Sequence, residues 1–327
     1  MSLNKLITSP VIRQAYFRAS AVRAFATSTI QQKEIKNVTV IGAGLMGAGI
    51  AQVAAQAQLK VTLVDTTEKA LENGQNIIGT SIKRVAKKLN PDDQAKQQEY
   101  IDNALNNIST TVDSKAAAKD ADLIVEAIVE NIKVKQQLFK DLDAAAPEHT
   151  IFASNTSSLS VTEIASATSE ARQKQFAGLH FFNPVPAMKL VEIVRTDKLQ
   201  EQVFEDLAQM SKKIGKSPVS CKDTPGFIVN RLLVPYMLEA FRILDRGEAS
   251  PQDVDTAMKL GAGMPMGPIE LADFVGLDTM KFIADGWRET GGIEPSLVTP
   301  VKVLDELVAE GRLGRKSGKG FYDYPKK

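Results

Sequence analysis

Cysteine and histidine are scarce in this sequence, which has one cysteine and two histidines among its 327 residues. A single thiol, Cys221, cannot build an intrachain disulfide framework and suits a reducing compartment. Long apolar runs are also lacking, because no window approaches the roughly 20 apolar residues that a membrane span requires. We expect no disulfide, no membrane span and no bound metal.

Acidic residues are absent from the first 33 positions, which are rich in Ser, Ala and Thr. Apolar residues alternate there with five basic ones, Lys5, Arg13, Arg18, Arg23 and Lys33. This composition is typical of a mitochondrial transit peptide, and the arginines interrupt the apolar core that a secretory signal needs. A disordered tail or a helix of the fold is the alternative. We expect residues 1–33 to be a transit peptide and linker, and the protein to lie in the mitochondrial matrix.

The charge of the remaining chain excludes one class of partner. The formal net charge is +1, so removing the five cations of the N-terminal segment leaves a net acidic body. Such a body has no overall attraction to nucleic acid or to an anionic membrane surface. We expect no nucleic-acid partner.

Short apolar segments alternate with helical patterns between residues 38 and 221. The first three, at 38–41, 45–58 and 61–65, predict a strand, a helix and a strand, and this βαβ unit should bury its strands on both faces. Further strands are expected at 110–112, 123–126, 150–153, 176–179 and 190–194, with helices such as 132–145 and 200–214 between them. This alternation predicts an α/β domain with a doubly wound, Rossmann-type sheet over residues 34–222.

Two regions differ from this alternation. Residues 68–108 are helical and highly charged, and the break at 90–93 predicts a helical-hairpin insertion whose second helix opens at Pro91 or Asp92. After Cys221 the strand signals stop, and helical runs alternate with Gly and Pro. We expect a smaller, all-helical C-terminal domain over residues 223–327.

A glycine motif lies between the first strand and the first helix. Gly42, Gly44 and Gly47 fit the pattern G-x-G-x-x-G, and Asp65 closes the next strand. The glycines allow a tight turn, close approach of a pyrophosphate and close packing of the helix, whose N-terminus at Leu45 and Met46 would face the phosphates. Asp65 would bind the adenosine ribose and repel a 2′-phosphate, which favours NAD over NADP. A plain glycine-rich turn with an exposed aspartate is the alternative.

One histidine lies where an α/β fold binds its ligand. His180 ends an apolar strand and precedes Phe181-Phe182-Asn183-Pro184, whereas His149 lies in a polar turn and is expected at the surface. Neutral imidazole can take the proton of an alcohol near neutral pH. Glu192 lies in the next apolar strand, where an unpaired carboxylate would be costly to bury, so it is expected to pair with His180. A structural ion pair elsewhere is the alternative for Glu192.

These residues belong to longer motifs. The segments GAGLMGAGIAQ, VEAIVEN, SNTSSL, GLHFFNPVP, MKLVEI, DTPGFIVN, AGMPMG and GKGFY closely resemble the mitochondrial short-chain L-3-hydroxyacyl-CoA dehydrogenases, from about Val38 to the C-terminus. The resemblance implies that His180 is the catalytic base, with Glu192 as its partner. It also implies that Ser157 and Asn230 contact the substrate, and that Ser157 reaches the nicotinamide as well. By themselves, Ser157 could be a helix cap and Asn230 a buried hydrogen-bonding group.

The resemblance assigns the remaining contacts residue by residue. Four further residues are implied to contact NAD: Asn183, Glu130, Lys135 and Lys316. Ser81 and Lys88 are implied to contact coenzyme A, together with Ser157. Lys83, Arg84, Lys87 and Lys88 at helical spacing form a basic stripe that could hold the anionic nucleotide. Taken alone, that stripe reads more readily as a solvated helix face.

The expected activity is therefore that of a hydroxyacyl-CoA dehydrogenase. It would transfer a hydride from C3 of (S)-3-hydroxyacyl-CoA to NAD in fatty-acid β-oxidation, giving the 3-oxoacyl-CoA. By resemblance, the C-terminal domain would contribute to substrate binding and form a homodimer. Two alternatives stay open: a relative acting on free hydroxy acids or sugar acids, and a cofactor-binding scaffold that has lost catalysis.

Overall fold

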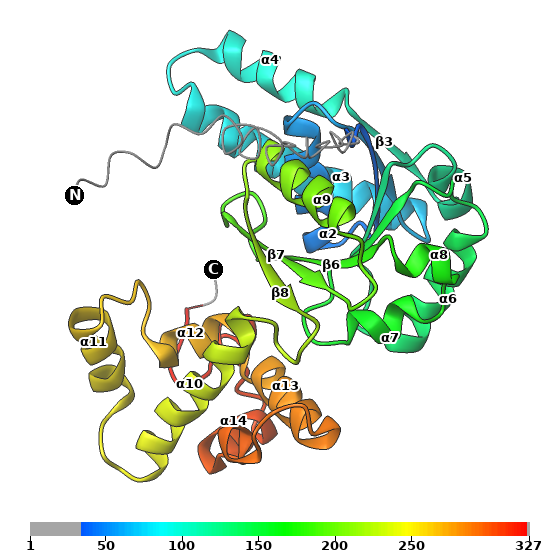
Figure 1. Ribbon diagram of the computed structural model, residues 1–327. Helices are drawn as coiled ribbons and strands as arrows, with labels where there is room; N and C mark the ends of the chain where they lie inside the picture. Colours follow the sequence, from blue (N-terminus) through cyan, green and yellow to red (C-terminus); the bar gives the residue numbers. More distant parts are fainter. Residues whose placement is uncertain (1–33, 326–327) are drawn as a thin grey trace, which may run out of the picture. The chain divides into compact units, whose positions relative to one another are not determined.

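The computed structural model describes residues 34–325 (Figure 1). The predicted transit peptide, residues 1–33, lies outside the described residues. Eight strands form one sheet in the order β3-β2-β1-β4-β5-β6-β7-β8. Their bounds are β1 Asn37–Ile41, β2 Lys60–Val64, β3 Ile108–Thr111, β4 Leu123–Glu126, β5 Ile151–Ser154, β6 Phe176–Phe181, β7 Leu190–Arg195 and β8 Ser217–Lys222. The predicted doubly wound α/β class is confirmed.

Helices cover both faces of the sheet. They are α2 Leu45–Gln56, α3 Glu68–Leu89, α4 Gln94–Leu105, α5 Ser114–Ala118, α6 Ile132–Asp143, α7 Val161–Ala165, α8 Glu170–Gln173 and α9 Glu201–Lys213. Alternate strand residues enter different cores. Val125 and Ile193 pack with α2, α3 and α9, whereas Ile124 and Val194 pack with α5, α6 and α7. This alternation of side chains is why the strands are apolar along their whole length.

Strand direction changes once, next to the predicted catalytic strand. The neighbours from β3 to β6 pair in parallel, but β6 and β7 are antiparallel, and β7 is parallel to β8. Hydrophobic periodicity does not encode strand direction, so the sequence could not predict this reversal. In the antiparallel register His180 lies directly opposite Glu192. Directly paired residues point to the same face of the sheet, so the two side chains become neighbours.

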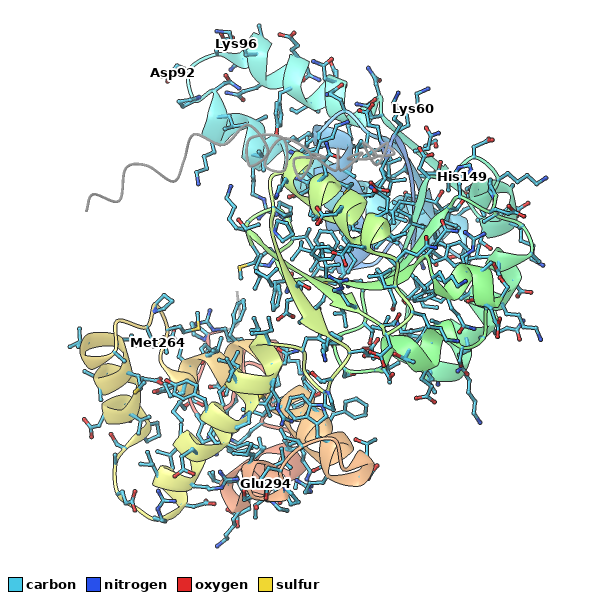
Figure 2. The ribbon with its side chains drawn as sticks, in the orientation of Figure 1. Lys60, Asp92, Lys96, His149, Met264 and Glu294 are labelled. Atoms are coloured by element: carbon cyan, nitrogen blue, oxygen red, sulfur yellow. The ribbon has the colours of Figure 1, made fainter. Side chains whose placement is uncertain are left out.

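The predicted helical hairpin is α3 and α4, with one correction at its turn. Asp93, and not Pro91 or Asp92, caps the second helix, and its Oδ1 accepts a hydrogen bond from the N–H of Lys96 at 3.0 Å. Asp92 stays in the turn at the tip of the hairpin (Figure 2). Asp93 is the residue whose carboxylate can reach the free N–H groups of the first turn. The helix predicted at 45–58 likewise ends earlier, at Gln56, before Gln58 turns to φ 62°.

After Lys222 the chain is helical, as predicted. The helices are α10 Val229–Asp245, α11 Pro251–Gly261, α12 Pro268–Val275, α13 Leu277–Thr290 and α14 Lys302–Ala309, with short 3₁₀ turns η2 Pro295–Val298 and η3 Arg315–Ser317. They enclose a separate core around Phe241, Met280 and Trp287. Within residues 34–325, no helix has the length and apolar character needed to cross a membrane.

Candidate active site

The glycine turn is closely packed on one side and open at its middle. A Cβ atom on Gly42 (φ +107°) would lie 2.4 Å from the Ala127 carbonyl oxygen, and one on Gly47 would lie 1.7 Å from the Gly42 carbonyl oxygen. A Cβ on Gly44 would meet no atom within 4 Å. Gly44 is also the N-cap of α2, and no side chain caps that helix end. The turn therefore has the form of a pyrophosphate cradle, with open space and a helix N-terminus at Gly44.

Asp65 follows β2 and reaches back to this turn. Its Oδ2 accepts a hydrogen bond from the N–H of Ala43 at 2.7 Å, and its Oδ1 accepts one from the N–H of Thr66 at 2.6 Å. Oδ1 also accepts a hydrogen bond from the Thr66 hydroxyl at 3.2 Å, whereas Oδ2 keeps a second lone pair for a further donor. The predicted ribose-binding carboxylate is thus held in place by the glycine turn.

His180 and Glu192 form a buried pair. His180 Nδ1 lies 2.7 Å from Glu192 Oε2, and the two residues are 5% and 0% exposed. The other oxygen of Glu192 accepts hydrogen bonds from the N–H groups of Ile228 and Val229, at 3.1 and 2.9 Å. A carboxylate facing Nδ1 keeps the proton of a neutral imidazole on that nitrogen, which leaves a lone pair on Nε2. The arrangement is that of a general base oriented by a carboxylate.

A pocket of about 350 Å³ opens beside His180. It brings together residues from the glycine turn, the ends of β4, β5 and β6, and the start of α10. Six predicted site residues line it: Met46, Glu130, Ser157, His180, Asn183 and Asn230. The aromatic ring of Phe182 lies 4.4 Å from the imidazole, centroid to centroid. The pocket therefore joins the predicted base to the predicted dinucleotide site.

Glu130 holds the loop that carries Ser157. Its Oε1 accepts hydrogen bonds from the Thr156 hydroxyl at 2.6 Å and from the N–H of Ser157 at 3.0 Å. Burial alone would raise the pKa of Glu130, but the Lys135 ammonium, 3.1 Å from its Oε2, and these hydrogen bonds outweigh it and lower that pKa. Glu130 is therefore a carboxylate at neutral pH.

Lys135 is buried behind this loop, with 1% of its surface exposed. Its ammonium lies 2.5 Å from Glu126 Oε1 and 3.1 Å from Glu130 Oε2. Glu126 Oε2 accepts a further hydrogen bond from the Ser154 hydroxyl at 2.6 Å. Lys135, which is expected to contact NAD, thus has its ammonium paired with two carboxylates of the protein.

Sequence reasoning missed three residues that shape the pocket. Asn155 Oδ1 accepts a hydrogen bond from the N–H of Phe181 at 2.8 Å, which joins the ends of β5 and β6 beside His180. Glu126 anchors Lys135. Asp223 accepts hydrogen bonds from the N–H groups of Val161 and Thr162, at 3.0 and 2.7 Å, and so ties the segment before α10 to α7. The available signal was their place in the SNTSSL, VEAIVEN and DTPGFIVN motifs.

The other predicted contacts lie outside this pocket. Ser81 lines a second hollow of about 440 Å³ with Arg84 and the loop Asn183–Pro186. Lys88 is exposed in the last turn of α3. Lys316 Nζ lies 2.5 Å from Asp278 Oδ1, beside Gly276. His149, labelled in Figure 2, is half exposed just before β5.

Comparison with known proteins agrees with this geometry. Residues 37–224 match the family model described as 3-hydroxyacyl-CoA dehydrogenase, NAD binding domain, and residues 226–324 match the model of the C-terminal domain of the same family. The chain is 54% identical over 313 residues to human mitochondrial hydroxyacyl-coenzyme A dehydrogenase, covering 96% of this chain and 99% of that protein. Identity to the rat protein of the same name is 57% over 290 residues, covering 89% and 91%.

A solved structure gives the same result. The crystal structure of (S)-3-hydroxybutyryl-CoA dehydrogenase from Ralstonia eutropha superimposes with a TM-score of 0.82 at 40% identity, covering 90% of this chain and 100% of that one. Both family models, the high identity and the common fold extend over nearly all the described residues. The chain belongs to the 3-hydroxyacyl-CoA dehydrogenase family.

Proposed function

We propose that this protein oxidises (S)-3-hydroxyacyl-CoA to 3-oxoacyl-CoA with NAD⁺, releasing NADH and a proton, as a step of fatty-acid β-oxidation. The observation that carries the proposal is the buried His180–Glu192 pair in a pocket that also contains the glycine turn's Met46. Membership of the family supports both the NAD cofactor and the acyl-CoA substrate. The packing of Gly42 and Gly47 and the open space at Gly44 fit a dinucleotide.

In this mechanism His180 Nε2 accepts the proton of the C3 hydroxyl. Glu192 stabilises the imidazolium that results, because its Oε2 faces Nδ1 at 2.7 Å. When bound, NAD⁺ supplies the acceptor for the hydride that leaves C3. Ser157 and Asn230 hold the substrate oxygen, and their proximity is consistent with this, since Asn230 Nδ2 lies 3.5 Å from the Ser157 carbonyl oxygen. In the reverse direction His180 returns the proton.

The remaining roles follow the family resemblance and the pocket walls. We assign NAD contacts to the glycine turn with Leu45 and Met46, to Asp65, and to Glu130, Ser157, Asn183, Lys135 and Lys316. Lys135 would act mainly by fixing Glu130, given where its ammonium lies. Ser81 and Lys88 would bind coenzyme A together with Ser157. The hollow that Ser81 and Arg84 line supports the assignment of Ser81 to coenzyme A.

Three further features are part of the proposal. The chain divides into a transit peptide and linker (1–33), an NAD-binding domain (34–222) and a helical domain (223–327). It works in the mitochondrial matrix, and the names of the mitochondrial relatives support the organelle. It forms a homodimer through the helical domain, which exposes Leu232, Leu260 and Phe282 at 68%, 83% and 64% of their surface. Light scattering should give twice the chain mass, and a monomer would refute the dimer.

The decisive experiment measures NADH formation with C4 to C16 (S)-3-hydroxyacyl-CoA thioesters, with free 3-hydroxybutyrate as the comparison. We expect turnover of the thioesters and little of the free acid. Preference for the free acid would favour the hydroxy-acid alternative, and NADH binding without turnover would favour the scaffold.

A further inference from the structure

Lys216 is a buried cation that the mechanism above does not use. It lies between α9 and β8, with only 7% of its surface exposed. Its Nζ donates hydrogen bonds to the carbonyl oxygens of Val185 and Met188, the second at 2.8 Å. Both acceptors are neutral backbone groups. A buried ammonium held by carbonyls needs a reason, because burial of charge without an opposite charge is costly.

The loop that Lys216 holds joins two pockets. Asn183 lines both the pocket of His180 and the hollow of Ser81, while Pro184, Val185 and Pro186 line the hollow. The turn inside this loop is closed by hydrogen bonds from the N–H groups of Ala187 and Met188 to the Pro184 carbonyl, both at 3.0 Å. The position of this short segment therefore sets the wall between the two pockets.

The opposite side of the loop packs on the dinucleotide-binding helix. A Cβ atom on Gly49 of α2 would lie 2.8 Å from Val185 Cβ and 3.6 Å from Pro186 Cδ. No larger residue fits there without moving the loop or the helix. Val185 is thus held between Gly49 on one side and the Lys216 ammonium on the other, and the loop has little freedom to shift.

We propose that Lys216 is a positioning residue of the active site, which holds residues 183–188 against α2 so that the dinucleotide pocket and the coenzyme A hollow keep their relative position. The positioning role rests on the proposed function only in one respect, the identity of the ligands that the two pockets bind. Lys216 itself touches neither pocket, so it acts through the loop.

The charge of Lys216 is sensitive to its surroundings. Burial, and then the positive charge of Lys189, lower the pKa of Lys216 to about 8. The loop between Asn183 and Met188 has no ionisable side chain. Two further cations stand at the end of α9, Lys212 and Lys213, and Lys213 pairs with Glu34 at 3.0 Å. On the other side of the loop, the hollow is lined by the uncharged Gln52 of α2 and by Arg84 of α3. Hydrogen bonds from an ammonium are roughly twice as strong as those from a neutral amine, so the loop should be held less firmly above this pH.

The first test is Lys216→Met in the full-length protein, which keeps the apolar stem and removes the ammonium. With a C4 thioester, KM should rise about tenfold or more at pH 7, because both charge-assisted hydrogen bonds to the loop are lost, while kcat changes by less than about twofold. A merely structural lysine would instead reduce the amount of active enzyme and leave KM unchanged, and that result would overturn the proposal.

Lys189→Met is the matched control, because it removes a neighbouring exposed positive charge from a residue outside both pockets. Its KM at pH 7 should equal that of the wild type. The wild-type KM should rise as the pH passes through about 8, and this rise should move to higher pH in Lys189→Met and be absent in Lys216→Met. An identical midpoint in the wild type and Lys189→Met would contradict a positioning role that depends on the charge of Lys216.

Amide hydrogen exchange separates this proposal from the proposed function. The amides of Ala187 and Met188 should exchange faster in Lys216→Met than in the wild type, with or without substrate. Faster exchange in a protein that turns over no thioester would refute the proposed activity and leave the loop assignment standing. Unchanged exchange in an active enzyme would refute the loop assignment alone.

Discussion

Asp65 accepts a hydrogen bond from the N–H of Ala43, at 2.7 Å, so the carboxylate that should choose the cofactor also fixes the glycine turn that should bind it. The residue is therefore expected to act on two quantities. Its negative charge affects the preference between NAD and NADP. Its oxygen affects the affinity for either cofactor, because the turn must keep its shape to approach the pyrophosphate.

Two substitutions of Asp65 separate these effects. Asp65→Asn keeps an oxygen for the Ala43 N–H but removes the charge, so the preference for NADH over NADPH should fall about tenfold or more, as expected when like-charge repulsion is relieved. Asp65→Gly should lower the preference equally and also weaken the binding of both cofactors. The measurement is kcat/KM with each cofactor. Wild-type preference in both variants would remove Asp65 from cofactor selection.

His180→Gln tests the base. The amide can still hydrogen-bond to Glu192 but cannot accept a proton, so kcat should fall by about 10²–10⁴, the usual contribution of a positioned base. NADH affinity, measured by fluorescence titration, should stay within about twofold because the imidazole is not part of the glycine turn. His149→Gln is the control and should retain full activity, since His149 is half exposed away from the pocket. Normal turnover by His180→Gln would exclude it as the base.

Glu192→Gln tests the orientation of the imidazole. The Gln oxygen can replace the acceptor for the N–H groups of Ile228 and Val229, but its NH₂ group would then face Nδ1 of His180. That contact forces the neutral imidazole proton onto Nε2, which can no longer accept a proton. By analogy with the serine-protease aspartate, we expect kcat to fall about 10³–10⁴-fold with little loss of stability. Nitrogen NMR shifts of His180 should show the changed tautomer, and an unchanged tautomer would refute the explanation.

Local sequence signals predicted the parts of the site that are made by neighbouring residues. The glycine turn and Asp65 each follow an apolar strand, and His180 is the next-to-last residue of one, so their place at the strand ends could be predicted. The pairing of His180 with Glu192 was predicted from the cost of burying a carboxylate, and the antiparallel register realises it. The direction of β7 itself could not be predicted, because hydrophobic periodicity is the same in both directions.

Buried cations were beyond sequence reasoning. Lys135 lies on a charged helix and Lys216 follows a charged helix end, and both resemble solvated residues in the sequence. Their burial depends on groups brought from elsewhere in the chain: Glu126 and Glu130 for Lys135, and the carbonyl oxygens of the loop for Lys216. Lys316 differs from both, because it stays exposed; only its partner Asp278, on α13, comes from elsewhere in the chain.

The buried Lys135 makes Glu126 important for stability. Glu126→Gln should lower the free energy of unfolding by an amount near the lower end of the ~3–5 kcal/mol expected when one partner of a buried ion pair is removed, because Glu130 still faces the ammonium. Urea unfolding measures this loss. Because Lys135 also faces Glu130, the pairing is tested by a double-mutant cycle: Glu126→Gln should cost less stability in Lys135→Met than in the wild type. An equal cost in both backgrounds would contradict the pairing.

Because of Lys216, the free energy of unfolding of the protein should depend on pH in the alkaline range. Its folded-state pKa, about 8, is below the ordinary lysine value of 10.5. Between these two pH values the unfolded chain binds more protons at this residue than the folded chain does, so the contribution of Lys216 to stability increases with pH. Below pH 8 the ammonium is present in both states, and its burial is a constant cost.

The free energy of unfolding of the wild type, relative to Lys216→Met, should therefore rise from pH 8 to about pH 10.5, by no more than about 1.4 kcal/mol per pH unit. Urea titrations of both proteins at pH 7, 8, 9 and 10 measure this difference, and in Lys189→Met the rise should begin at a higher pH, because the positive charge that helps to lower the pKa of Lys216 is removed. A flat difference would show that Lys216 has the same proton affinity in the folded and unfolded chain, while a falling one would show that the loop carbonyls stabilise the ammonium more than burial destabilises it.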